Sequence, residues 1–298
     1  MKILCLIITF LSLLLAVVFG FAGAGQKEAA KKYLADAENL NQMRQEYEAE
    51  ITQIDQKIAA LTPEKEKLSA EKNRLEEMNR YRTEKTAFLT FDDGPSYNTL
   101  KILDILKKYD IKATFFVVAS KLDNPSSLEA LQRMADEGHT IAVHAYNHVY
   151  SDLYKSKDAF FEDFDKASAL IEEKTGKKPE IARLPGGTYS AWQFCQKYGG
   201  DGGIFDEIMD EFEKRNIMVA DWNVDSEDWN STTSASAATE NILSGARRRL
   251  GGEYKTALIL MHDFSNTIAS LENTINQLKS MGFAFETLNN GGYFYRQK

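Results

Sequence analysis

The sequence predicts an α/β domain with a parallel sheet, on the strength of two observations. From about residue 84, short apolar runs rich in β-branched and aromatic residues alternate with longer amphipathic stretches, as strands alternate with helices. Acidic and histidine residues directly follow several of these apolar runs. In parallel α/β folds, the residues of an active site commonly lie at the carboxyl ends of the strands. The alternation fits either a parallel α/β barrel or a doubly wound sheet.

The predicted elements follow from this alternation in chain order. Strands are expected at 86–91, 112–118, 140–143, 181–184, 217–221, 256–261 and 283–287. Helices are expected at 97–108, 126–137, 157–174, 203–215, 236–248 and 267–280. We therefore expect one domain over residues 84–298, whose length of about 215 residues is compatible with a single core.

Composition narrows the class of protein further. Of 298 residues, 43% are hydrophobic and 27% are charged, which is typical of a globular chain and not of a disordered one. The net charge of −8 argues against nucleic acid as a partner. The two cysteines are Cys5, in an apolar N-terminal segment, and Cys195, so no structural disulfide is expected between them. We expect Cys195 to be a buried apolar side chain.

Residues 1–26 are expected to be a membrane anchor or a signal peptide. No charged residue occurs between Ile3 and Ala22, a length of about 20 residues that could cross a bilayer as a helix. Lys2 before this stretch favours an N-terminus inside and a domain outside the cell. The small residues 22–24 would also suit signal-peptide cleavage. The first alternative predicts a single-pass membrane protein with an extracellular domain, and the second a secreted protein.

Residues 27–83 are expected to form a helical coiled-coil stalk, because they are charged, helix-forming and free of glycine. One heptad position holds Tyr33, Leu40, Tyr47, Ile54, Leu61, Leu68 and Leu75. Its partner position holds Ala37, Arg44, Ile51, Ile58, Lys65, Lys72 and Asn79, whose polar members weaken the seam. The alternatives are a helical hairpin packed on the domain and a dimerisation helix through which the chain self-associates.

Two adjacent carboxylates, Asp92 and Asp93, end the first apolar run of the domain, and Gly94-Pro95 forces a turn behind them. Carboxylates placed at a strand end suit metal binding or acid–base work, although Asp-Asp-Gly is also a common turn. His144 and His148 follow the third apolar run, and histidines four apart share one face of a helical turn. Together with Asp93 they would make an open catalytic zinc site.

Three further motifs also lie at strand ends. The first is Arg183-Leu-Pro-Gly-Gly187, in which the arginine can orient a carboxylate and the glycines expose backbone N–H groups. The second is the stretch 221–229, which is rich in acids and contains two tryptophans of the kind that stack on sugar rings. The third is a buried run that ends in His262, a candidate acid or base.

In this order, the five motifs resemble the polysaccharide deacetylases (NodB-homology domains, carbohydrate esterase family 4), and the resemblance covers roughly residues 84–290. Thr-Phe-Asp-Asp-Gly-Pro at 90–95 is its most specific part. The resemblance implies a distorted (β/α)7 barrel and a divalent metal, usually zinc. It also implies hydrolysis of the N-acetyl group of a sugar.

The resemblance assigns a role to each matching residue. Asp92 matches the general base, and Arg183 the residue that positions it. Asp93, His144 and His148 match the metal ligands. His262 matches the general acid, with Asp228 tuning it. Trp229 and Leu260 match the walls of the acetyl pocket, and a backbone N–H near Gly186 would stabilise the oxyanion. Ala145 departs from the usual Ser or Thr that braces this loop, so we expect a less rigid loop.

Peptidoglycan is the expected substrate, because an anchor and a stalk would place the domain over a cell wall. The block 183–187 also resembles wall deacetylases more than chitin deacetylases. Alternative substrates are poly-N-acetylglucosamine, chitin oligomers and acetylxylan. A different class of function is an inactive glycan-binding module on a coiled-coil scaffold.

Overall fold

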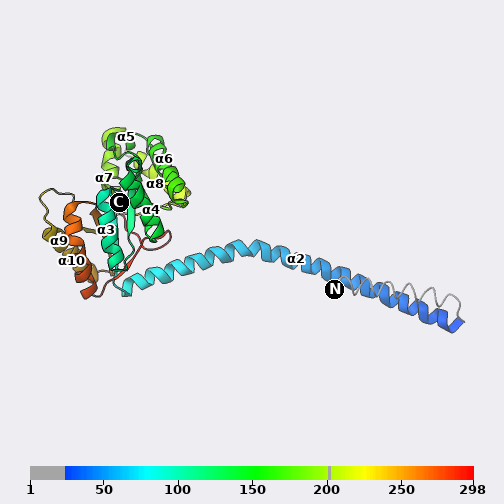
Figure 1. Cartoon of the computed structure of the whole chain (residues 1–298). Coiled ribbons are helices and arrows are strands. Elements are labelled where there is room, and N and C mark those ends of the chain that lie inside the picture. The colour runs from blue at the N-terminus through cyan, green and yellow to red at the C-terminus, as the bar shows by residue number, and fades with distance from the viewer. Residues whose placement is uncertain (1–23, 201–202) are drawn as a thin grey trace. The chain divides into compact units, whose positions relative to one another are not determined.

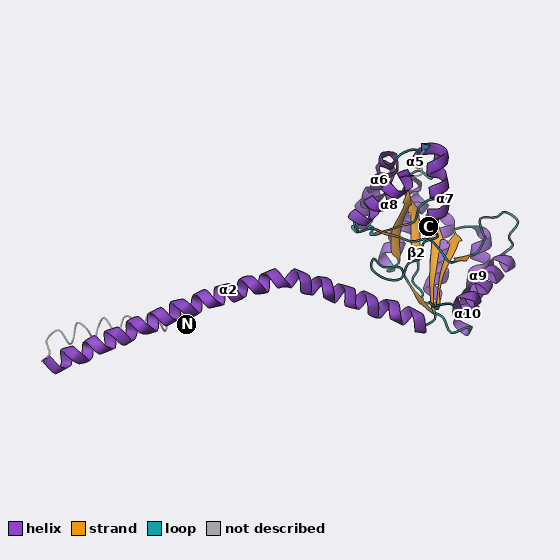
Figure 2. Ribbon diagram, turned by 180° about the vertical axis from the view of Figure 1, so that it is seen from behind, coloured by secondary structure: helices purple, strands orange, loops and turns teal. Residues whose placement is uncertain are grey.

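The computed structural model describes residues 24–200 and 203–298, shown in Figures 1 and 2. The described residues fall into two compact units, which divide between Lys72 and Asn73. In the first unit they form a single helix, the greater part of α2 (Ala24–Thr83). Because α2 is one continuous helix, the alternative of a helical hairpin over residues 27–83 is wrong.

The second unit alternates strands and helices as the sequence predicts. Its strands are β1 (Thr86–Asp92), β2 (Thr114–Val118), β3 (Thr140–Ala145), β4 (Ile181–Ala182), β5 (Met218–Val219), β6 (Val224–Asp225), β7 (Thr256–His262) and β8 (Ala284–Glu286). Its helices are α3 (Tyr97–Lys108), η1 (Ala119–Asp123), α4 (Pro125–Asp136), α5 (Tyr150–Leu153), α6 (Lys157–Thr175), α7 (Gly187–Phe194), η2 (Cys195–Gly199), α8 (Gly203–Lys214), α9 (Ala235–Leu250) and α10 (Ser265–Ser280).

Polar residues at the helix ends explain where several helices begin. The side chains of Ser96, Asn124, Ser156 and Ser234 each accept a backbone N–H from the first turn of α3, α4, α6 and α9, respectively. Such caps satisfy N–H groups that have no partner within the helix. Helix α6 ends at Gly176, whose φ of 71° is in the left-handed region that glycine adopts readily.

All strand pairs are parallel, in the order β5-β4-β3-β2-β1-β7-β6, with β8 paired to the first half of β1. Neighbouring helices pack on one another in a row, α9-α10-α3-α4-α6-α8. Figure 1 labels each of these helices, and Figure 2 shows the strands among the helices. All seven residues of β1 are buried, as expected for a central strand with both faces covered.

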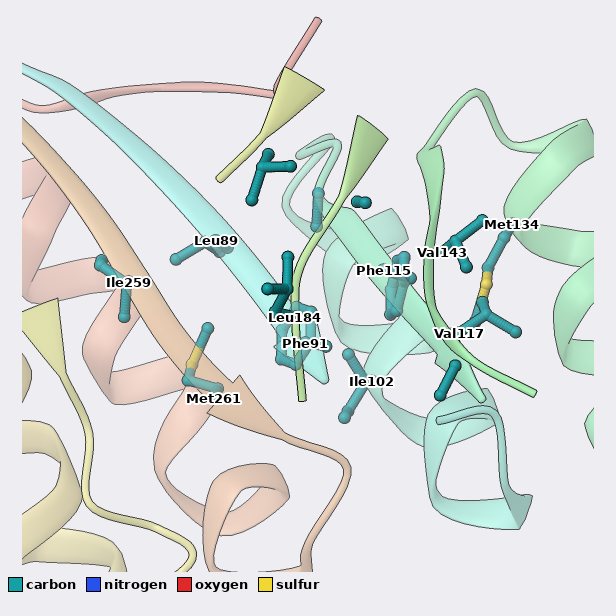
Figure 3. Close-up of a cluster of buried hydrophobic side chains, with 14 of the residues drawn as sticks. Leu89, Phe91, Ile102, Phe115, Val117, Met134, Val143, Leu184, Ile259 and Met261 are labelled. Atoms are coloured by element: carbon teal, nitrogen blue, oxygen red, sulfur yellow. The ribbon is translucent and has the colours of Figure 1, made fainter. Parts of the chain in front are cut away.

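Side chains alternate between the two faces of the sheet. Leu89 and Phe91 of β1 point to the helices and join Ile102 of α3 and Phe115 of β2 in the larger core, drawn in Figure 3. Phe88 lies on the opposite, inner face in a second cluster. The inner cluster consists of Tyr81, Phe88, Phe116, Ala142, Ile181, Met218, Ala220, Leu258, Leu288 and Tyr293. The predicted burial of Cys195 is confirmed, since it belongs to the larger core.

The predicted distorted (β/α)7 barrel is wrong, because the sheet is an open half-barrel of eight strands. Its two end strands, β5 and β6, do not pair with each other. Only residues 220–223 connect them, and these residues contain no helix. The end of β5 and the start of β6 are therefore at most about 18 Å apart. The backbone N–H of Asp221 in this link donates instead to the carbonyl of Tyr295 in the C-terminal tail. The short link and the tail therefore occupy the opening.

The predicted transmembrane helix also needs correction. Across residues 24–200 and 203–298, no helix combines the length and the apolar character needed to cross a bilayer. The segment for which the sequence predicts a span, residues 3–22, lies outside these described residues.

Candidate active site

Side chains from four strands meet at the carboxyl edge of the inner face. In β1, Asp92 lies on the same face as Phe88, four residues earlier, and in β7 His262 lies on the same face as Leu258. Arg183 follows β4, two residues after Ile181 of the inner cluster. In β3, the register with β2 shifts at one extra residue, His144, and such bulges commonly re-aim side chains at active sites.

The first group at this edge is a fully buried ion pair between Asp92 and Arg183. The Nη1 of Arg183 lies 2.7 Å from Oδ1 of Asp92, with exposed fractions of 0% and 3% for the two residues. The guanidinium also donates to Thr90 Oγ1 and to the carbonyls of Ala220 and Asp221. Each guanidinium nitrogen thus donates at least one hydrogen bond, which fixes the orientation of the pair with Asp92.

The second group consists of Asp93, His144 and His148, whose candidate ligand atoms all lie within 4.8 Å of one another. The Nε2 atoms of both histidines are 3.4 Å from Asp93 Oδ1. The Nδ1 of His144 lies 2.8 Å from the carbonyl oxygen of Arg183, so it carries the proton and leaves Nε2 free to bind a metal. The expected helical turn is wrong: His144 belongs to β3, and a non-helical loop brings His148 beside it.

These residues fit a divalent metal. Asp93 Oδ1 is buried yet has no hydrogen-bond partner among the described residues, and buried polar atoms normally have one. Burial alone would raise the pKa of Asp93, but the rings of His144 and His148 lower it overall, so the carboxylate is ionised. Two imidazole nitrogens and one carboxylate form the donor set of an open catalytic site.

The third group is His262 with Asp228. The Nδ1 of His262 lies 2.7 Å from Asp228 Oδ1, and Asp228 Oδ2 accepts the backbone N–H of His262 and the hydroxyl of Thr267. Burial disfavours the imidazolium, but the hydrogen bond and charge of Asp228 outweigh it and raise the pKa of His262 to about 9. At neutral pH His262 therefore carries a proton on Nε2. The ring of Phe264 stacks on the ring of His262, with ring centroids 5.2 Å apart.

Gly186 and Gly187 form a tight turn behind Arg183. Both have positive φ, and a Cβ on Gly187 would lie 2.9 Å from the indole of Trp222. Of the two residues predicted to line the acetyl pocket, Leu260 is buried in β7, and Trp229 beside Asp228 is 59% exposed. An exposed tryptophan at a site edge offers a flat apolar face on which a sugar ring can stack.

Sequence reasoning missed the residues that hold the site loops. Asp263 accepts the hydroxyls of Ser96 and Thr99, which ties the loop after β7 to the loop after β1. Asp163 accepts the backbone N–H groups of Tyr146 and Asn147. An acid next to a histidine motif could have indicated Asp263, whereas Asp163 has the pattern of an ordinary charged helix residue.

Comparison with known proteins identifies the same family as the sequence motifs. Residues 79–197 match the family model described as polysaccharide deacetylase. The Bacillus subtilis protein named "Putative polysaccharide deacetylase YheN" is 31% identical over 210 residues, which cover 69% of this chain and 67% of that protein. A Bacillus cereus peptidoglycan-N-acetylglucosamine deacetylase is 29% identical over 216 residues, covering 70% and 71%.

A solved structure is also similar to this chain. It is the catalytic domain of a peptidoglycan N-acetylglucosamine deacetylase from Eubacterium rectale, with a TM-score of 0.64 and 30% identity. The match covers 72% of this chain and 93% of that one. This chain therefore belongs to the polysaccharide deacetylase family and is an enzyme of the hydrolase class.

Proposed function

We propose that this chain is a metal-dependent deacetylase that acts on the N-acetylglucosamine residues of peptidoglycan. The observation that carries the proposal is the meeting of three groups at one sheet edge: the Asp93, His144 and His148 cluster, the Asp92–Arg183 pair, and the His262–Asp228 pair. Relatives named as peptidoglycan deacetylases support this choice of substrate.

Each residue would have one task in the hydrolysis. Asp93, His144 and His148 would hold a divalent metal, for which zinc suits the donor set. Bound there, such an ion would polarise the amide carbonyl and lower the pKa of water. Arg183 engages Oδ1 of Asp92, so Oδ2 would take the proton from the attacking water.

His262 would complete the reaction on the other side of the amide. Its Nδ1 is bound to Asp228, so the proton on Nε2 would go to the departing nitrogen as the C–N bond breaks. The products are acetate and a free glucosamine amine. Trp229 would stack on a sugar ring, and a backbone N–H near Gly186 would stabilise the oxyanion.

Peptidoglycan lies outside the cytoplasmic membrane, so the proposal requires export of the chain. The uncharged stretch 3–22, followed by the small residues at 22–24, would serve as the export signal. Fractionation of cells that express the full chain tests this location. Recovery of the enzyme in the cytoplasm alone would contradict it.

The substrate is tested by incubating the full chain, supplied with zinc, with peptidoglycan, chitin oligomers, poly-N-acetylglucosamine and acetylxylan. We expect acetate release from peptidoglycan to be fastest. Faster release from one of the other glycans would support deacetylase activity but identify that glycan, and not peptidoglycan, as the substrate. Binding without release from any glycan would favour a glycan-binding module.

We also infer that α2 pairs in parallel with α2 of a second copy. The seven apolar residues spaced seven apart from Tyr33 to Leu75 are each at least 49% exposed. The second seam position of the heptad holds the cations Arg44, Lys65 and Lys72. In a parallel coiled coil, a residue at this position lies beside the residue that is one place earlier in the sequence of the other copy. Lys65 would then lie beside Glu64 of the second copy, which provides charge complementarity.

The oligomeric state of the full chain tests this pairing. Sedimentation should give a dimer, and Leu61→Lys, which places a charge in the seam, should shift it to monomer. Gln56→Lys adds the same charge outside the seam and should remain dimeric. A monomeric wild type, or equal behaviour of the two variants, would contradict the pairing.

A further inference from the structure

The two candidate histidine ligands are separated by a loop that has no regular backbone hydrogen bonding. His144 lies in β3, and residues 146–149 belong to no helix or strand. In a helix, i→i−4 hydrogen bonds would fix the spacing of two histidines four residues apart. Here the ring centroids lie 5.0 Å apart without that support. Other contacts must therefore hold the loop in the shape that brings both Nε2 atoms to Asp93.

A single carboxylate on α6 supplies such contacts. The backbone N–H of Tyr146 donates to Oδ1 of Asp163 at 2.6 Å, and that of Asn147 donates to Oδ2 at 2.8 Å. Both donors lie between His144 and His148. Hydrogen bonds to an ionised acceptor are shorter and stronger than those between neutral groups, and two parallel bonds also fix an orientation.

Helix α6 is a rigid base for this carboxylate. Phe160, Phe164 and Ala167 bury its inner side, and the helix packs against β3. One turn after Asp163, the Nζ of Lys166 lies 3.6 Å from the centroid of the Tyr146 ring. Two side chains on one face of α6 therefore hold the same loop residue.

Ala145 does not supply such support itself. Its methyl side chain has no hydrogen-bonding group, so residue 145 cannot brace the loop from within. Asp163 instead contacts the loop from α6, a helix distant in sequence.

We infer that Asp163 is a positioning residue for the metal site: it fixes the loop between His144 and His148 while touching neither metal nor substrate. The inference rests on the proposed function, because it requires the Asp93, His144 and His148 cluster to bind a metal. Partners that orient ligands from outside commonly contribute about 10- to 100-fold to metal affinity.

The test compares the zinc affinity of full-chain variants by competition with a chromophoric chelator, without any glycan. Asp163→Asn keeps the size of the side chain but loses the charge and one acceptor oxygen, so we expect about 10- to 100-fold weaker zinc binding. Asp165→Asn is the matched control, because Asp165 lies on the same helix, is exposed and pairs with Arg215. Its zinc affinity should equal that of the wild type.

Thermal unfolding of the metal-free variants separates positioning from general stability. We expect Asp163→Asn and Asp165→Asn to unfold at similar temperatures while their zinc affinities differ. Cobalt in place of zinc gives a second readout, since an altered ligand arrangement changes its visible absorption spectrum. Equal zinc affinity and equal cobalt spectra for the two variants would overturn the inference.

Two further outcomes are distinguishable. If Asp163→Asn does not fold, Asp163→Glu decides: it keeps both acceptor oxygens one methylene further out, and we expect zinc binding weaker than in the control. Control-level zinc binding by Asp163→Glu would then contradict the inference. If the wild type itself binds neither zinc nor cobalt, the proposed metal site fails, and this inference with it.

Discussion

Asp92 and His262 are direct partners in the register of β1 and β7, so the candidate base and the candidate acid stand side by side on adjacent parallel strands. Each is fixed by a different buried partner, Asp92 by Arg183 and His262 by Asp228. The two partners have opposite charges. The cation Arg183 orients Asp92, which would accept a proton, and the anion Asp228 raises the pKa of His262, which would donate one. Such a division between neighbouring groups suits general base and general acid roles.

Replacing Arg183 should destabilise the fold strongly. Arg183→Met removes one member of a fully buried ion pair and leaves the Asp92 carboxylate without its cation, which typically costs about 3–5 kcal/mol. Arg183→Lys should recover only part of this, because a point charge cannot replace a planar group with several donors. Denaturant unfolding of the metal-free full chain measures both.

Arg247→Met is the control for this prediction, since Arg247 pairs with Glu240 on the surface with both side chains more than half exposed. An exposed pair of this kind contributes about 1 kcal/mol or less to the free energy of unfolding. Equal losses for Arg183→Met and Arg247→Met would show that the buried pair has no special role in the fold.

The pH dependence of kcat should reveal His262. The pKa of His262 is raised to about 9, so the group is protonated below that pH and loses its proton above it. Since the acid role needs the protonated form, kcat should fall as pH rises through about 9. Asp228→Asn removes the main cause that raises this pKa and leaves the burial that lowers it, so the fall should move to lower pH. An unchanged alkaline limb in Asp228→Asn would contradict the assignment.

The turn behind Arg183 should not tolerate a side chain at residue 187. Gly187 has a φ of 77°, and an added Cβ would lie 2.9 Å from Trp222. Left-handed backbone costs about 1–2 kcal/mol for a residue with a Cβ, and the clash adds to it. Gly187→Ala should therefore lower the melting temperature and the activity. Gly251→Ala, at negative φ with no close side chain, should change neither. Similar melting temperatures for the two variants would contradict this account of the turn.

Much of the second unit could be predicted from the sequence, because several of its strands lie in apolar runs that end in charged or histidine residues. The runs at 86–91 and 256–261 correspond to β1 and β7, and the motif residues at their ends meet at the same sheet edge. Parallel strands place their carboxyl ends together, so a motif placed at each end implies a shared site.

The rest depends on contacts between distant segments. The opening of the sheet could not be predicted because β6 has only two residues and gives no apolar run, while the link 220–223 is too short to contain a helix. The spacing of His144 and His148 suggested a helical turn, but the strand β3 extends to Ala145 and a loop follows it. The brace from Asp163 joins residues 16 and 17 positions apart, which no local pattern can reveal.

The central claim is that the Asp93, His144 and His148 cluster makes this chain a metal-dependent deacetylase. The most direct test is acetate release from peptidoglycan by the full chain, measured with zinc, after removal of metal by a chelator, and after zinc is restored. We predict release with zinc, loss in chelator and recovery on restoring zinc. Asp92→Asn should still bind zinc yet release acetate about 10²- to 10⁴-fold more slowly. Release that is unaffected by the chelator, or equal in Asp92→Asn, would contradict the account.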